Sequence, residues 1–156
     1  MRDTCKMGLI GAALLMAVGS SAWAAGPVGP NNVKFDETAV KASLTGQPGD
    51  PAAGRKTFID KKLGNCLACH KNSEMSEQQF HGEVGTPLDG VADRWKPEEL
   101  RAIVVNSKRV FGPETVMPGF YSLEVGAHVA KDFEGQTILS AQQVEDIVAY
   151  LGTLKD

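Results

Sequence analysis

The stretch LGNCLACHKN, Leu63 to Asn72, places two cysteines two residues apart and a histidine directly after the second. Cys66, Cys69 and His70 are therefore three potential ligands carried by little more than one turn of chain. Thiols at this spacing can form a disulfide, bind a metal ion or attach a haem. The compartment of the protein and its remaining cysteines decide between these options.

The first 24 residues have the pattern of a secretory signal peptide. Two basic residues precede an apolar run at 7–18, and Ala22 and Ala24 place small side chains where a signal peptidase reads them. The run is shorter than the roughly 20 apolar residues that a membrane span needs, which disfavours a retained anchor. We expect cleavage before Ala25, export to the periplasm and no membrane attachment afterwards.

Cleavage changes both the charge and the cysteine count. Residues 1–24 hold two of the 16 basic residues and one of the 19 acidic ones, so the formal charge goes from −3 to −4. Cys5 is removed, which leaves only Cys66 and Cys69. The mature chain shows no internal repeat, low-complexity tract or basic patch, so we expect no nucleic-acid partner.

A redox dithiol and a zinc site are the alternatives to haem. A thioredoxin-type motif follows a strand, but here Asp50 and Pro51 supply the N-cap and first position of a helix before the motif. Zinc would need a second ligand pair, and His81 and His128 lie too far apart to form one. The Cys-x-x-Cys-His pattern therefore favours one covalently attached haem c, with Cys66 and Cys69 bonded to the vinyl groups and His70 on the iron.

The sixth iron ligand decides between electron transfer and ligand chemistry. Of the five methionines, three leave with the signal peptide, and Met75 follows Cys69 too closely to reach the opposite haem face. Met117 remains, in a proline-bracketed stretch that disfavours helix and stiffens a loop. We predict Met117 as the second axial ligand, with His81 and His128 as rivals.

Helical patterns surround this centre. Helices are predicted at about 51–60, 97–107 and 140–154. The second has an apolar face, and the third begins with a Ser-x-x-Gln capping box. Residues 25–32 look disordered, and 33–47 show no strong period. The sequence predicts a small all-α domain in which the haem is part of the core.

The chain resembles the class I cytochromes c. The resemblance lies in a first helix with Gly54 and Phe58, the Cys66–His70 motif, the Met117 loop and a last helix bearing Tyr150. It implies that the first and last helices cross at these residues. It divides the chain into a signal peptide (1–24), an irregular N-terminal extension (25–48) and a cytochrome c domain (49–156).

Residues 85–94 are similar to a turn of this family whose proline carbonyl accepts the proton of the ligating histidine. Thr86 stands where that proline usually is, and its carbonyl can still bind His70. Arg94 resembles the family arginine that pairs with a haem propionate; the alternative is a plain surface arginine.

Four stretches are closer to the SoxX family, the monohaem subunits of SoxAX complexes in bacterial thiosulfate oxidation: Gly64–His70, Gly85–Arg94, Pro113–Pro118 and Gln142–Asp146. The resemblance implies a heterodimer with a SoxA-like haem subunit, which joins thiosulfate to a cysteine of the SoxYZ carrier as an L-cysteine S-thiosulfotransferase. This chain would pass the released electrons to a soluble cytochrome c, with no catalytic residues of its own. Alternatives are a free-standing periplasmic electron carrier and a haem sensor that binds a gas at a vacated sixth site.

The segment between Met117 and the last helix is longer than a plain connection needs. Its apolar residues are Phe120, Tyr121, Leu123, Val125, Val129 and Phe133. They either fold back over the haem domain or form a partner interface beside the Met117 loop. Lys61 and Lys62 mark the opposite face, near the attachment motif.

Overall fold

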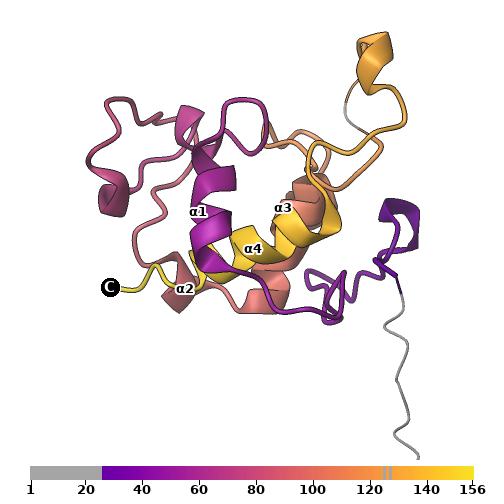
Figure 1. Cartoon of the computed structure of the whole chain (residues 1–156), viewed down its shortest axis with the longest axis horizontal. Coiled ribbons are helices and arrows are strands. Elements are labelled where there is room, and N and C mark those ends of the chain that lie inside the picture. The colour runs from indigo at the N-terminus through magenta and orange to yellow at the C-terminus, as the bar shows by residue number, and fades with distance from the viewer. Residues whose placement is uncertain (1–25, 125, 127) are drawn as a thin grey trace, which may run out of the picture.

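The computed structural model describes residues 26–124, 126 and 128–156, which form four α-helices joined by irregular connections (Figure 1). The helices are α1 (Pro51–Ile59), α2 (Val91–Arg94), α3 (Pro97–Phe111) and α4 (Ala141–Leu151). Single 3₁₀ turns lie at Pro30–Asn32, Cys66–Ala68, Ser73–Met75 and Lys131–Phe133. In these ranges the only β pairing is an isolated bridge between Asp36 and Ala39, so the all-α prediction is confirmed.

Two predictions fall outside this part of the chain. The signal peptide and its cleavage before Ala25 lie in residues that the structure does not describe. None of the helices that it does describe is long and apolar enough to cross a membrane.

Helix ends follow the predicted capping residues. The Asp50 carboxylate accepts a hydrogen bond from Ala52 N at 2.8 Å and starts α1. At α4, Ser140 Oγ accepts from Gln143 N at 3.2 Å while Gln143 Oε1 accepts from Ser140 N at 2.8 Å. These side chains satisfy amide groups that a helix N-terminus leaves unpaired. The three predicted helices are confirmed, although α3 extends to Phe111 and α4 ends at Leu151 rather than at residue 154.

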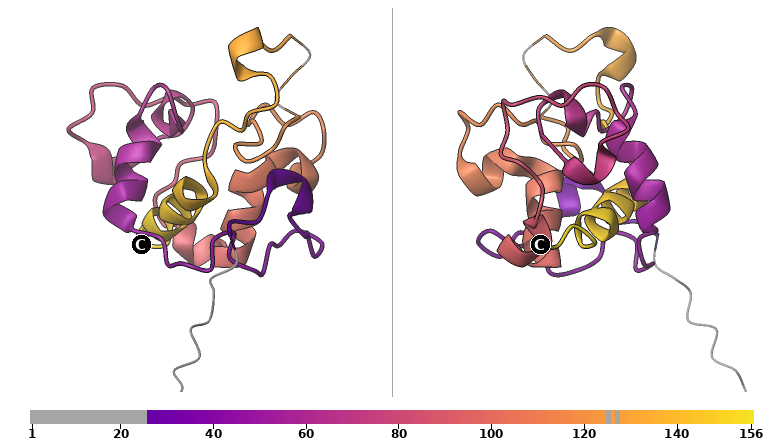
Figure 2. Two further views of the ribbon diagram at one scale, coloured as in Figure 1. Left: turned by 45° about the vertical axis from the view of Figure 1, so that its right-hand side comes forward. Right: turned by 90° about the vertical axis from the view of Figure 1, so that its left-hand side faces the viewer.

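Helices α1 and α4 cross in close contact (Figures 1 and 2). A Cβ atom on Gly54 would lie 2.0 Å from Asp146 O, so only glycine allows this approach. Phe58 packs edge-on against Tyr150, with ring centroids 5.4 Å apart. Such edge-to-face pairs add about 0.5–1.5 kcal/mol to their area burial. The predicted crossing is confirmed.

The N-terminal extension is irregular, as predicted, but it belongs to the core. Val40 and Leu44 are both buried, and Val28 N donates to Leu44 O at 2.7 Å. The prediction of disorder up to residue 32 is therefore wrong for the described part of that stretch. The cause is a long-range contact that has no local pattern: Glu145 Oε1 on α4 accepts from Leu44 N at 2.7 Å.

Much of the segment after Met117 also folds back onto the domain. Phe120 and Tyr121 are buried, and the Tyr121 hydroxyl donates to Val28 O at 2.7 Å. The interface interpretation is therefore wrong for these two residues, while Val125 lies outside the described residues. Phe133 is 64% exposed, on the 3₁₀ turn that projects from the helical body in Figures 1 and 2.

Candidate functional site

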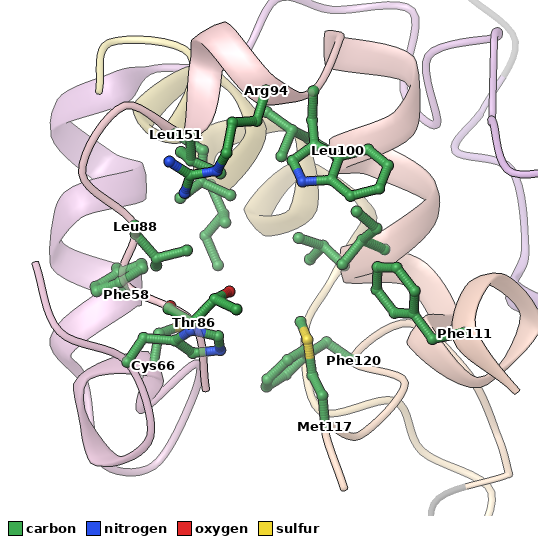
Figure 3. A pocket seen from close by; sticks show the side chains of 16 residues that line it. Phe58, Cys66, Thr86, Leu88, Arg94, Leu100, Phe111, Met117, Phe120 and Leu151 are labelled. Atoms are coloured by element: carbon green, nitrogen blue, oxygen red, sulfur yellow. Dashed lines mark hydrogen bonds between the residues drawn. The ribbon is translucent and has the colours of Figure 1, made fainter. Parts of the chain in front are cut away.

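A cavity of about 720 Å³, counting its open mouth, is lined by residues of α1, α2, α3, α4 and the three loops that carry the sequence motifs (Figure 3). Its walls are mostly apolar. Its apolar lining side chains include Phe58, Leu88, Leu100, Val104, Ile147 and Leu151. Cofactor sites have this apolar character, with a few polar groups that fix orientation.

The attachment motif forms one side of the cavity. Cys66 begins a 3₁₀ turn, and its carbonyl accepts from Cys69 N at 3.1 Å and from His70 N at 2.9 Å. This tight turn brings Cys66 and His70 to the cavity, whereas Cys69 is half-buried beside it and is not among the lining residues. Neither cysteine is in a disulfide.

Burial raises the pKa of the Cys66 thiol to about 12. As a free thiol it would therefore stay protonated at neutral pH. Redox-active cysteines instead have a lowered pKa, because the thiolate is the nucleophile. This local environment, together with the absence of a strand in the described residues before the motif, disfavours the thioredoxin alternative.

The His70 ring is held by the backbone of the following loop. His70 Nδ1 lies 2.7 Å from Thr86 O, so the ring donates from Nδ1 and leaves Nε2 free to act as a ligand. A Cβ atom on Gly85 would lie 2.4 Å from His70 Cε1, so the loop can approach the ring only with glycine there. The predicted hydrogen bond to the Thr86 carbonyl is confirmed.

Met117 reaches the same cavity from the other side. Figure 3 shows Cys66 and Thr86 at one edge and Met117 with Phe120 across the space from them. Met117 is half-buried, and its neighbour Val116 is 79% exposed. The loop thus turns the thioether inward and the preceding valine outward.

The other sulfur and imidazole candidates lie elsewhere. Met75 is fully buried and does not line the cavity. His81 Nδ1 accepts from Asn72 N at 3.1 Å, and its Nε2 lies 3.1 Å from Met75 O, so both ring nitrogens are engaged. His128 is exposed. In the described ranges no three His, Cys, Asp or Glu side chains gather as metal ligands, whereas a structural zinc site uses four protein ligands.

Arg94 stands at the cavity with its guanidinium fixed by backbone. Nη1 donates to Asp89 O at 2.6 Å and Nη2 to Pro87 O at 2.8 Å. Figure 3 shows the side chain at the rim of the space. A guanidinium has five N–H donors, so donors remain for an anionic group of a ligand.

The residues present fit a covalent haem. Apolar walls suit a flat macrocycle, and the two motif cysteines supply thiols next to one edge of the cavity. An imidazole nitrogen and a thioether come from different sides, which is the ligand pair of many cytochromes c. An arginine at the rim has free donors for a carboxylate.

Comparisons with known proteins agree with this chemistry. The family model described as cytochrome c matches residues 51–155. The chain is also similar to a solved structure described as SoxXA from P. pantotrophus, with a TM-score of 0.77 and 42% sequence identity. That match covers 83% of this chain and 99% of the other. The search of curated proteins gave no match. The chain belongs to the cytochrome c family, as a SoxX-like monohaem cytochrome with one covalently bound haem c.

Proposed function

We propose that this chain is the electron-transfer subunit of a periplasmic SoxAX-type complex. It would accept electrons from a SoxA-like haem subunit while thiosulfate is joined oxidatively to a cysteine of the SoxYZ carrier. It would then pass them to a soluble cytochrome c. The observation that carries the proposal is the 42% identity to SoxXA from P. pantotrophus over 83% of the chain.

The chain would act in an L-cysteine S-thiosulfotransferase without catalysing a reaction itself. The sequence contains no cysteine after Cys69, and both motif cysteines are assigned here to haem attachment. No thiol would then remain in the mature chain to serve as a nucleophile or carrier. Its role in the complex would then be electron relay through the haem.

We propose that Cys66 and Cys69 would hold the haem through thioether bonds and that His70 and Met117 would ligate its iron. When bound, the haem supplies a one-electron iron couple whose potential depends on the axial ligands. The support for His70 is its fixed tautomer, because Nδ1 lies 2.7 Å from Thr86 O and Nε2 is left for the metal. The support for Met117 is its place at the cavity, away from the attachment motif.

The protein around the haem would control solvent and charge. The apolar walls exclude water and so limit the reorganisation that accompanies electron transfer, and they affect the potential. Arg94 is placed to bind a propionate with the donors that Asp89 O and Pro87 O do not use. A charged propionate at the rim of the cavity would need a partner such as the Arg94 guanidinium.

Co-purification separates the proposed subunit from the free-standing carrier. The tagged mature chain is expressed in a native periplasm, captured, and the proteins that accompany it are separated and stained for haem. We expect a second haem-bearing subunit in stoichiometric amount, because an obligate subunit stays with its partner. Capture of the chain without another haem protein would favour the free-standing carrier.

A further inference from the structure

Helix α3 is interrupted where it faces the Met117 loop. Asn106 has φ −156° and ψ 92°, an extended conformation inside the range Pro97–Phe111. In a continuous helix the carbonyls of Val104 and Val105 would accept from amides four residues later. Here they accept from Phe120 N and Tyr121 N, each at 3.1 Å. The interruption thus leaves two carbonyls of the helix to accept hydrogen bonds from the segment after Met117.

The next residue, Ser107, holds Met117 directly. Its side chain is fully buried, and its hydroxyl donates to Met117 O at 2.6 Å. Pro118 O lies 3.5 Å from the same hydroxyl. A hydroxyl without its partner would be costly at this depth, so the bond fixes the backbone from which the thioether extends.

Further contacts hold the Met117 loop against the interrupted part of α3. A Cβ atom on Gly119 would lie 3.1 Å from Asn106 Oδ1, so loop and interruption are packed together. Asn106 Nδ2 also lies 3.4 Å from Ser122 Oγ. Lys108 Nζ donates to Pro113 O at 3.4 Å and to Thr115 O, so this lysine also binds the backbone of the segment that leads to Met117.

We propose that Ser107 is a positioning residue that keeps Met117 on the haem iron. This inference rests on the proposed assignment of Met117 as an axial ligand. Because the hydroxyl restrains the loop when the thioether points into the cavity, its loss should favour release of the thioether. An external ligand would then compete more easily for the sixth position.

The test uses the oxidised holoprotein and imidazole as the competing ligand. Imidazole displaces the thioether, and the loss of the far-red sulfur-to-iron absorption band reports the displacement. Ser107→Ala should bind imidazole about fivefold more tightly than the wild type, the change that one hydrogen bond of this kind is worth. Ser107→Thr keeps the hydroxyl and should return the affinity towards the wild-type value.

Thr153→Val is the matched control. Thr153 Oγ1 donates to Tyr150 O at 2.6 Å, the same kind and length of bond, at the end of α4 and away from the Met117 loop. This variant should bind imidazole like the wild type. If Ser107→Ala does not retain its haem, Lys108→Met is measured instead. It removes the hydrogen bond that the half-buried Lys108 donates to Thr115 O in the same loop.

The possible results distinguish failure of the Met117 assignment from failure of the Ser107 inference. A wild-type protein without the far-red band would overturn both the Met117 assignment and this inference. A band that is present in the wild type and lost in Met117→Ala would support the assignment. With that result, unchanged imidazole affinity in Ser107→Ala, or an equal increase in Thr153→Val, would overturn the inference alone.

Discussion

Replacement of Arg101 by methionine tests whether the N-terminal extension is an integral part of the haem domain. Arg101 on α3 forms a two-point ion pair with Glu145 on α4, with Nε 2.9 Å from Oε1 and Nη2 2.9 Å from Oε2. Its Nη1 donates to Val40 O at 2.9 Å. The same carboxylate accepts from Leu44 N at 2.7 Å. One ion pair therefore joins the extension to both helices.

The expected loss of stability in Arg101→Met follows from the burial of the ion pair. The side chains of Arg101 and Glu145 are 12% and 5% exposed. In Arg101→Met the Glu145 carboxylate stays buried and keeps only the Leu44 amide as a partner. Removal of one member of a buried pair costs about 3–5 kcal/mol, because a charge is left without its counterion. That is a large fraction of the roughly 5–15 kcal/mol that stabilises a typical domain.

Denaturant unfolding of the holoprotein, followed by circular dichroism, measures this loss. Arg101→Met with Glu145→Gln should be less destabilised than Arg101→Met alone, since the uncompensated charge is gone. Arg55→Met is the exposed control: Arg55 Nη2 lies 2.6 Å from Glu77 Oε1 on the surface, and we expect a much smaller change there. A free energy of unfolding for Arg101→Met within about 0.5 kcal/mol of the wild type would show that this ion pair does not hold the extension to the domain.

Two further predictions concern the haem and the helix crossing. Cys66→Ser combined with Cys69→Ser should yield a chain without covalent haem that lacks cooperative unfolding; helical circular dichroism close to that of the holoprotein would contradict a structural role for haem. In Gly54→Ala the new Cβ would lie 2.0 Å from Asp146 O, so α1 and α4 must separate, with a loss of about 1–3 kcal/mol or more in denaturant unfolding. Gly152→Ala is its control, because a Cβ there has its nearest neighbours at 3.4 Å, and equal losses in both variants would contradict the explanation.

The helices could be predicted from the sequence because their signals are local. Asp50 before Pro51 and the box formed by Ser140 and Gln143 mark helix starts in a few adjacent residues. The apolar spacing of the last helix likewise indicates which face is buried. Met117 could be chosen by eliminating the other methionines, and the structure brings it to the same cavity as Cys66.

The features that the sequence did not reveal depend on contacts between distant residues. Val40 and Leu44 are buried because Arg101 and Glu145 bind the backbone of their segment, and no periodicity marks this. The interruption of α3 at Asn106 is similar, since its carbonyl partners come from the loop after Met117. The folding back of Phe120 and Tyr121 follows from the same hydrogen bonds.

The far-red absorption band of the oxidised protein, compared between the wild type and Met117→Ala, tests directly whether Met117 is the sixth ligand of the haem iron. If Met117 is the sixth ligand, the wild type has the sulfur-to-iron band and the variant lacks it. The variant should retain its haem, since Cys66 and Cys69 hold it, and should have a lower reduction potential because a thioether favours ferrous iron. A band that persists in Met117→Ala, with an unchanged potential, would contradict the assignment of Met117 as the iron ligand.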